Sequence, residues 1–337
     1  MDFKRFFNIK RTKMVDEAAF NHTPMPIIKT VGIFVLVFII AQLFTSFLVS
    51  IPTVIYLFAS GDVLEISNAY ISGLISEDEY VNSMALLTEN LPIWLTLVSL
   101  FLYVGIIVVA VYYCVKKEKR TLASMGIRRG NIALEYLFGA LIGAIMLSLS
   151  LLIPYLCGLV SFEVNPEGFS LVLVLFFLAF VVQGASEEIL VRGYFMVSLA
   201  RDTKVSVAVA ISSCAFALLH LGNAGLSPIA LINIALMGAF LGIYVFKRGN
   251  LWGACAIHTA WNFVQGNIFG IKVSGMGNLP SLLKMVSKSD LTLLTGGEFG
   301  IEGSLCSTLV ILIFIVLVLL VPQNKNETSE VEVEYFA

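Results

Sequence analysis

Residues 184–193 read GASEEILVRG and place three charged side chains inside a long apolar stretch. The run from Phe169 to Val182 is almost wholly apolar, and helical periodicity continues through Met196, which predicts a helix that crosses a membrane. An ionised carboxylate at bilayer depth costs at least a few kcal/mol, so it usually has a partner, a water-filled cavity or a function. The rest of the chain is placed around this segment.

The two glutamates of this segment have different predicted roles. Glu188 and Arg192 are four residues apart and share a helix face, which favours an ion pair between them. Glu187 is turned by about 100° from Glu188 and points elsewhere. We therefore expect Glu188 to be structural and Glu187 to be free for chemistry.

The composition indicates a protein of the lipid bilayer. Of the 337 residues, 58% are hydrophobic and 13% are charged, whereas an ordinary soluble domain has about 45–50% and 25%. The predicted fold class is therefore all-α, a polytopic membrane protein of about eight transmembrane helices. A formal net charge of -2 gives no indication of a nucleic-acid partner.

Apolar runs predict seven further spans around the helix at 169–200. They lie at about 27–60, 91–115, 132–158, 205–221, 228–246, 251–271 and 304–321. All but three of the 21 Lys and Arg residues fall on one side of this arrangement, together with both termini; the exceptions are Lys272, Lys284 and Lys288. By the positive-inside rule both termini are then cytoplasmic, and we expect a bacterial cell membrane.

The predicted spans divide the chain into five parts. They are a cytoplasmic arm (1–26), two helices with an acidic outer loop (27–118), a catalytic core (119–271), an outer loop with the last span (272–322) and an acidic cytoplasmic tail (323–337). The basic arm is expected to lie at the membrane surface.

Further polar residues lie inside the spans of the core. His258 and Asn262 are four apart and share a helix face, and His220 follows Phe216 by four, so that the aromatic ring can pack beneath the imidazole. At about 1.5 Å per residue, helix lengths place Glu187 and these polar residues at compatible depths. The sequence therefore predicts one intramembrane polar site.

This set of residues suits hydrolysis. A Glu and a His can hold and deprotonate a water molecule, with Glu187 as the general base. His258 and Asn262 can donate hydrogen bonds to an oxyanion on the attacked carbonyl. Ser186 lacks the glycine pattern of a nucleophile elbow, so we favour activated water over an acyl-enzyme. The cavity is expected to open toward the cytoplasm, with apolar walls that hold a membrane-associated peptide or protein.

Three motifs carry a resemblance to a known family. The patterns EExxxR at 187–192, FxxxH at 216–220 and HxxxN at 258–262 occur in this order on separate spans. They resemble the motifs of the CAAX-protease and bacteriocin-processing (CPBP, or Abi) family of intramembrane proteases, which includes type II CAAX prenyl endopeptidases. The resemblance covers about residues 120–265, and Val191 departs from the aromatic residue that many members have before the arginine.

The resemblance implies roles for the motif residues. Water activation falls to Glu187 and His220. Oxyanion contacts fall to His258 and Asn262, and structural or substrate-orienting roles to Glu188, Arg192 and Phe216. Members of the family trim prenylated CAAX tails or act in bacteriocin maturation, self-immunity and membrane-protein processing, so an intramembrane endopeptidase is the expected function.

Three other hypotheses use the same residues. A zinc-dependent protease would take Glu187, His220 and His258 as ligands with an open fourth position, although the chain has no HExxH helix; no other cofactor is indicated. A non-enzymatic immunity protein that sequesters a peptide would tolerate Glu187→Gln. A proton-coupled transporter would leave paired halves in the sequence, and we find none.

Overall fold

The computed structural model describes residues 9–20, 22–89, 91–166, 168–277 and 279–330, and every predicted span in it is helical. The spans are α3 (Ile27–Ala59), α6 with α7 and η1 (Ile93–Leu102, Val104–Tyr112, Tyr113–Lys117), α8 (Ile132–Leu156), α9 with η3 and α10 (Leu171–Glu188, Ile189–Met196, Val197–Asp202), α11 (Val205–Leu218), α12 (Pro228–Arg248), α13 with η4 (Trp252–Phe263, Val264–Ile268) and α15 (Leu305–Leu320). The chain is a polytopic all-α membrane protein, as predicted.

The helices differ in length. Within the described residues, five are long and apolar enough to cross a membrane, and α11 and α15 are shorter apolar helices. The 14 residues of α11 extend about 21 Å, which is less than the roughly 30 Å of a hydrocarbon core. The turn that follows α11 therefore lies within the depth of the bundle, where irregular backbone is tolerated if it lines a cavity.

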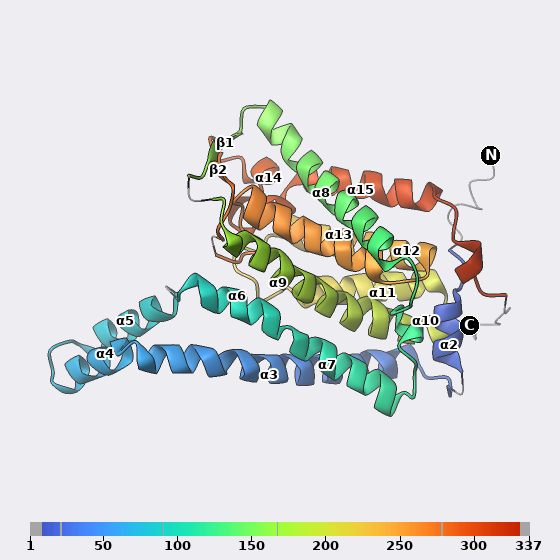
Figure 1. The fold of residues 1–337 in the computed structure, drawn as a ribbon, viewed down its shortest axis with the longest axis horizontal. Coiled ribbons are helices and arrows are strands. Elements are labelled where there is room, and N and C mark those ends of the chain that lie inside the picture. The colour runs from blue at the N-terminus through green and yellow to red at the C-terminus, as the bar shows by residue number, and fades with distance from the viewer. Residues whose placement is uncertain (1–8, 21, 90, 167, 278, 331–337) are drawn as a thin grey trace.

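The bundle has two distinct ends. Both described ends of the chain lie at one of them, which we call the terminal end (Figure 1). At the other, the β end, strand β1 (Val160–Val164) pairs antiparallel with β2 (Leu283–Ser287), with Val160 opposite Ser287. The sequence analysis treated both segments as loops. The short helices α14 (Thr292–Thr295), η5 (Gly297–Phe299) and η6 (Ile301–Gly303) follow β2, whereas η2 (Ala123–Met125) packs against α2 and η3.

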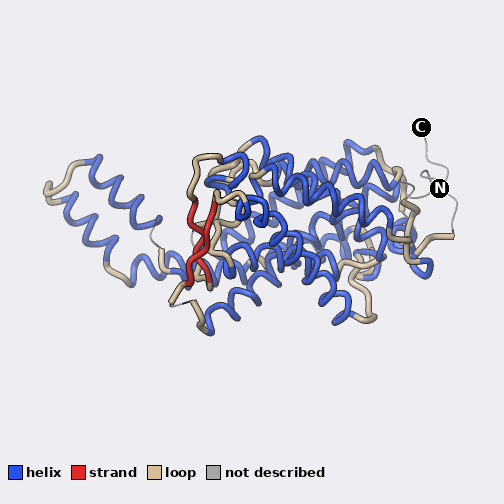
Figure 2. Tube along the Cα trace, turned by 90° about the horizontal axis from the view of Figure 1, so that it is seen from above, coloured by secondary structure: helices blue, strands red, loops and turns tan. Residues whose placement is uncertain are grey.

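The acidic segment after α3 is helical rather than a loop. It forms α4 (Asp62–Ile71) and α5 (Glu77–Glu89), which project beyond the β end (Figures 1 and 2). Ser76 and Glu79 form a capping box, because the Glu79 carboxylate accepts from the Ser76 N–H at 2.8 Å and Ser76 Oγ accepts from the Glu79 N–H at 3.3 Å. The Ser76 N–H and the Ser76 hydroxyl both donate to the Glu79 carboxylate and lower its pKa.

Small residues let α8 and α13 pack with their backbones in contact. A Cβ atom on Gly143 would lie 2.3 Å from the carbonyl oxygen of Ile257, and one on Gly139 would lie 2.3 Å from that of Gly253. Glycine is the residue that permits such close approach of helices in a membrane. On its other side α13 packs against α9. These contacts set the position of the helix that carries His258.

We expect Gly143→Ala to destabilise the protein by about 1–3 kcal/mol, because the added methyl group must push α8 away from α13. Thermal unfolding in detergent measures the effect. Gly32→Ala on α3 is the matched control, since nothing lies within 4 Å of a Cβ atom there. Equal unfolding temperatures for the two variants would contradict the close packing.

The N-terminal arm packs on the bundle rather than lying only at the membrane surface. Met14 and Val15 of α2 (Lys13–Ala19) are fully buried. Arg11 Nη1 donates to the carbonyl oxygen of Ala200 at 2.9 Å, so the arm satisfies the C-terminal end of α10. Lys4 and Arg5, two of the basic residues of the predicted arm, lie outside the described residues.

The C-terminal tail in turn pairs with the arm. Thr12 and Thr328 form an isolated antiparallel bridge, and the Ser329 N–H donates to the carbonyl oxygen of Arg11 at 2.9 Å. Glu327, in η7 (Lys325–Glu327), accepts from Arg128 Nη1 at 2.5 Å. Arm and tail together form a clasp over the terminal end.

Candidate active site

The helix that carries the glutamate pair changes its winding directly after the pair. α9 ends at Glu188, and the next residues form the π-helix η3 (Ile189–Met196), whereas the sequence predicted a regular helix. Such π-turns are rare and occur often at functional sites. Gly193 permits close packing here, since a Cβ atom on it would lie 2.9 Å from the carbonyl oxygen of Met125.

A buried arginine from outside the motifs supports this π-helix. Arg120 Nη2 donates to the carbonyl oxygen of Gly193 at 2.8 Å, and its Nη1 donates to that of Tyr194 at 3.3 Å and to Ser198 Oγ at 2.9 Å. Carbonyl groups inside a membrane protein need such partners. Arg120 was not among the predicted site residues, although it lies at the start of the range that the family resemblance covers.

The ion pair expected between Glu188 and Arg192 is present next to the site. Arg192 Nη1 donates to Glu188 Oε1 at 2.9 Å, and the two side chains are 1% and 0% exposed. The Arg192 guanidinium also lies over the Phe216 ring at 4.1 Å from its centroid. Phe216 packs edge-on against His220, with 4.8 Å between ring centroids. The ion pair therefore supports the aromatic ring on which His220 rests.

The imidazole of His258 lies between the two glutamates. Its Nδ1 is 2.9 Å from Glu188 Oε1. Since an ionised carboxylate only accepts hydrogen bonds, Nδ1 carries the hydrogen, and Nε2 of the neutral ring is then an acceptor. This Nε2 is 3.8 Å from Glu187 Oε2, too far for a direct hydrogen bond. The Glu187 side chain is 19% exposed.

Glu187 Oε2 is a buried oxygen with no hydrogen-bond partner within the described residues. It faces His258 Nε2, which is also an acceptor when the ring is neutral, so that a donor between the two makes the contact favourable. A water molecule that donates one hydrogen to each acceptor is such a donor, and contacts longer than about 3.5 Å between polar groups are commonly bridged in this way.

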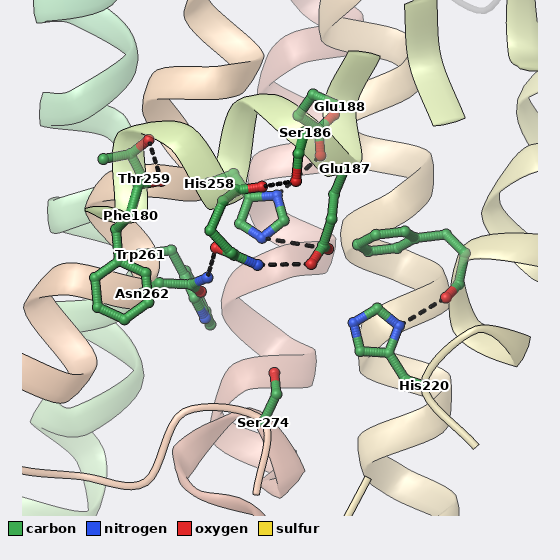
Figure 3. Close-up of polar contacts among 12 residues, drawn as sticks. Phe180, Ser186, Glu187, Glu188, His220, His258, Thr259, Trp261, Asn262 and Ser274 are labelled. Atoms are coloured by element: carbon green, nitrogen blue, oxygen red, sulfur yellow. Dashed lines mark hydrogen bonds and ion pairs between the residues drawn. The ribbon is translucent and has the colours of Figure 1, made fainter. Parts of the chain in front are cut away.

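Gln183 connects Glu187 to the third motif. Its Nε2 donates to Glu187 Oε1 at 2.6 Å, and its Oε1 accepts from Asn262 Nδ2 at 2.9 Å (Figure 3). The sequence analysis missed this residue because the apolar run was read only to Val182. The spacing of four between Gln183 and Glu187 on one helix was the signal that could have found it.

His220 lies across from this group, in the turn after α11. Its Nδ1 is 2.8 Å from the carbonyl oxygen of Phe216, so Nδ1 donates and Nε2 of the neutral ring is an acceptor. Figure 3 shows the other ring nitrogen turned toward Glu187. Glu187 and Asn262 are thus connected through Gln183, His258 lies beside Glu187, and His220 faces them from the turn after α11.

A cavity of about 40 Å³ adjoins these residues. A cavity that holds one water needs at least about 10–15 Å³, so there is room for water at the site. Its walls are formed by Phe216, His220, Asn233, Ile234, Met237, Leu241, His258, Trp261, Asn262, Ser274, Glu302 and Ile311.

The cavity lies toward the β end, not toward the terminal end as the sequence analysis expected. Two of its wall residues, Ser274 and Glu302, belong to the segments between η4 and α15 that lie at the β end. The terminal side of Glu188 is filled by buried Arg192 and by the π-helix, whose residues are all buried. Because α11 is short, the space beyond its C-terminal end lies on the side of the β end.

Two alternative chemistries fit this geometry less well. Ser186 is fully buried and its hydroxyl donates to the carbonyl oxygen of Gln183 at 2.6 Å, so it is not presented as a nucleophile. Within the described residues, no three His, Cys, Asp or Glu side chains are grouped so that they could hold a metal ion. Glu187, His220 and His258, the ligands that a zinc-dependent protease would use, are not grouped in this way in the described structure.

Comparison with known proteins locates the site in a recognised segment. Residues 169–264 match the family model described as type II CAAX prenyl endopeptidase Rce1-like. This range contains all three motifs. No curated protein and no solved structure matches the chain.

Proposed function

We propose, on the premise that residues 169–264 belong to the Rce1-like family of type II CAAX prenyl endopeptidases, that this membrane protein hydrolyses a peptide bond in a membrane-associated peptide or protein. The observation that carries the proposal is the buried, unpartnered Glu187 Oε2, 3.8 Å from His258 Nε2. A carboxylate in that position, next to His258 in the wall of a cavity with room for water, suits a general base.

The reaction begins with a water molecule held between Glu187 Oε2 and His258 Nε2. Its oxygen attacks the peptide carbonyl carbon while Glu187 takes a proton, which gives a tetrahedral oxyanion. Asn262 has a second amide hydrogen besides the one it donates to Gln183, and this hydrogen stabilises the oxyanion. The C–N bond then breaks, and Glu187 returns its proton to the leaving amine.

The roles proposed here for the two histidines differ from those in the sequence-based hypothesis. That hypothesis paired Glu187 with His220 for water activation and assigned His258 to the oxyanion. The distances favour His258 as the partner of Glu187, because its Nδ1–H is held by Glu188 and its Nε2 faces the base. His220 presents an acceptor from the opposite wall, where it orients the peptide or a second water.

The cellular setting follows from the distribution of charge. With the terminal end in the cytoplasm of a bacterial cell, as the positive-inside rule favours, the β end and its cavity face outward. A protease with this orientation acts on peptides that reach the outer half of the membrane. Bacteriocin maturation or self-immunity is a setting of this kind.

The proposed function is tested by comparing membrane and secreted peptides from cells that make equal amounts of the wild-type protein and Glu187→Gln. Mass spectrometry should find fragments that depend on the wild-type protein. Identical peptide sets, under conditions where the protein serves its cell, would instead support a non-enzymatic protein that sequesters a peptide. Loss of cleavage with a chelator would support the zinc-dependent alternative.

Gln183→Met should lower the rate constant of cleavage by about tenfold to a hundredfold, because both Glu187 and Asn262 lose the side chain that holds them in register. KM should change little, since Gln183 is not in the cavity wall. Kinetics on a purified substrate measure both constants. The control is Ser186→Ala in the same helix, which should retain activity, and equal effects of the two variants would argue for general disturbance of α9.

A further inference from the structure

Glu302 is a carboxylate in the wall of the cavity that the motifs do not include. It lies in η6, outside the matched range, and shares the cavity with His220, His258 and Asn262. Its Oε1 accepts from Trp261 Nε1 at 2.9 Å, and its Oε2 accepts from the N–H and Oγ of Ser274 at 2.9 and 2.8 Å. Figure 3 shows Ser274 and Trp261 bordering the site.

The three donors to Glu302 are all neutral groups. Within the described part of the chain, Glu302 takes part in no ion pair, and the nearby Lys272 pairs with Glu298 instead. The two oxygens of a carboxylate accept about four hydrogen bonds, so three donors leave capacity for another. Glu302 therefore brings a negative charge to the cavity without a protein countercharge.

Among the described residues, the only basic side chains in the cavity wall are the imidazoles of His220 and His258, which the proposed reaction uses as neutral rings. The wall contains no Lys or Arg. Arg192 is separated from the cavity by the ring of Phe216 and is paired with Glu188. A buried or half-buried charge is favourable only when it is paired, so the missing partner is expected to come from a ligand.

The β end of the protein, toward which the cavity lies, has the same sign of charge. By sequence, the three β-end segments at 60–91, 157–170 and 269–304 contain, besides Glu302, ten Asp and Glu residues and three Lys residues. A surface of this kind raises the local concentration of cationic ligands and lowers that of anions. This observation is independent of Glu302 and points to the same class of ligand.

We propose that the site selects a peptide with a lysine or arginine side chain close to the scissile bond, and that Glu302 is the specificity residue that receives it. The proposal rests on the proposed function. The substrate class is then a cationic membrane-associated peptide.

The test uses the full-length protein in nanodiscs and a series of membrane-anchored peptides that match a fragment found by mass spectrometry. Each position near the cleavage site is in turn Lys, norleucine or Glu. Wild-type protein should cleave the best Lys peptide about tenfold to a hundredfold faster, as kcat/KM, than its norleucine counterpart. The Glu peptide should be slower still.

Glu302→Gln should reduce this preference to nearly one while cleavage of the norleucine peptide changes by less than about threefold. Ser274→Ala removes a hydrogen bond to the same side chain but no charge, so its Lys preference should persist. Glu163→Gln, an exposed change on β1 outside the cavity, is the second control. Equal loss for all peptides in Glu302→Gln would show a purely structural role and overturn the proposal.

The outcomes separate this proposal from the proposed function. Cleavage that depends on Glu187 but ignores peptide charge would refute the specificity role alone. Cleavage that is absent, or unchanged in Glu187→Gln, would refute the proposed function. In that case fluorescence anisotropy of the same labelled peptides still decides the specificity question, because binding to wild-type protein must favour Lys and lose that preference in Glu302→Gln.

Discussion

Glu187→Gln is expected to lower the rate of peptide cleavage by about 10²- to 10⁴-fold, the range that general acid–base groups contribute. The amide is nearly isosteric with the carboxylate, and its oxygen can still accept from Gln183 Nε2. It cannot take a proton from water at neutral pH. The variant should therefore insert and fold normally, and the loss should appear in kcat measured with purified protein and substrate.

Two comparisons make this result specific. Glu163→Gln makes the same chemical change on β1, away from the site, and should cleave at the wild-type rate. The unfolding temperature of Glu187→Gln should match that of the wild type, because no buried charge is left without its partner. Wild-type cleavage by Glu187→Gln would show that Glu187 is not the base.

Arg192→Ala should be the most destabilising single change in the core, by about 3–5 kcal/mol, because it leaves Glu188 as an uncompensated buried charge. Both side chains of the pair are almost fully enclosed. The Phe216 ring also loses the guanidinium that lies over it, at 4.1 Å. A lower amount of inserted protein and a lower unfolding temperature in detergent are the measurements.

The double variant Glu188→Gln/Arg192→Met separates charge from packing. It removes both charges and keeps side chains of similar volume, so it should be more stable than Arg192→Ala. His258 then loses its carboxylate acceptor, and activity should remain low even where stability returns. If Arg192→Ala matches the wild type in unfolding temperature, the ion pair does not support the core.

The helical structure of the eight predicted spans could be predicted, as could the Glu188–Arg192 ion pair, because both depend on local pattern. Apolar length determines a span, and a spacing of four determines which side chains meet on a helix. The same rules would have shown α5, whose capping box at Ser76 and Glu79 is readable in the sequence. The acidic segment after α3 was predicted to be a loop because its charges indicate only solvent exposure, which a helix also permits.

Three features could not be predicted in this way: the π-helix, the role of Glu302, and the end of the bundle on which the cavity lies. The π-helix depends on Arg120 and Met125, which approach Gly193 from another part of the chain. Glu302 reaches the site only because Trp261 and Ser274 hold it there. The cavity faces the β end because α11 stops short, and hydropathy alone extended that helix to residue 221.

The clasp at the terminal end has a consequence for how the protein is made. The arm is among the first segments to leave the ribosome, yet the backbone that Arg11 binds is synthesised almost two hundred residues later, and Thr328 and Ser329 later still. The terminal end therefore cannot close while the chain is being translated. Until Thr328 and Ser329 have left the ribosome, the clasp over the terminal end is incomplete.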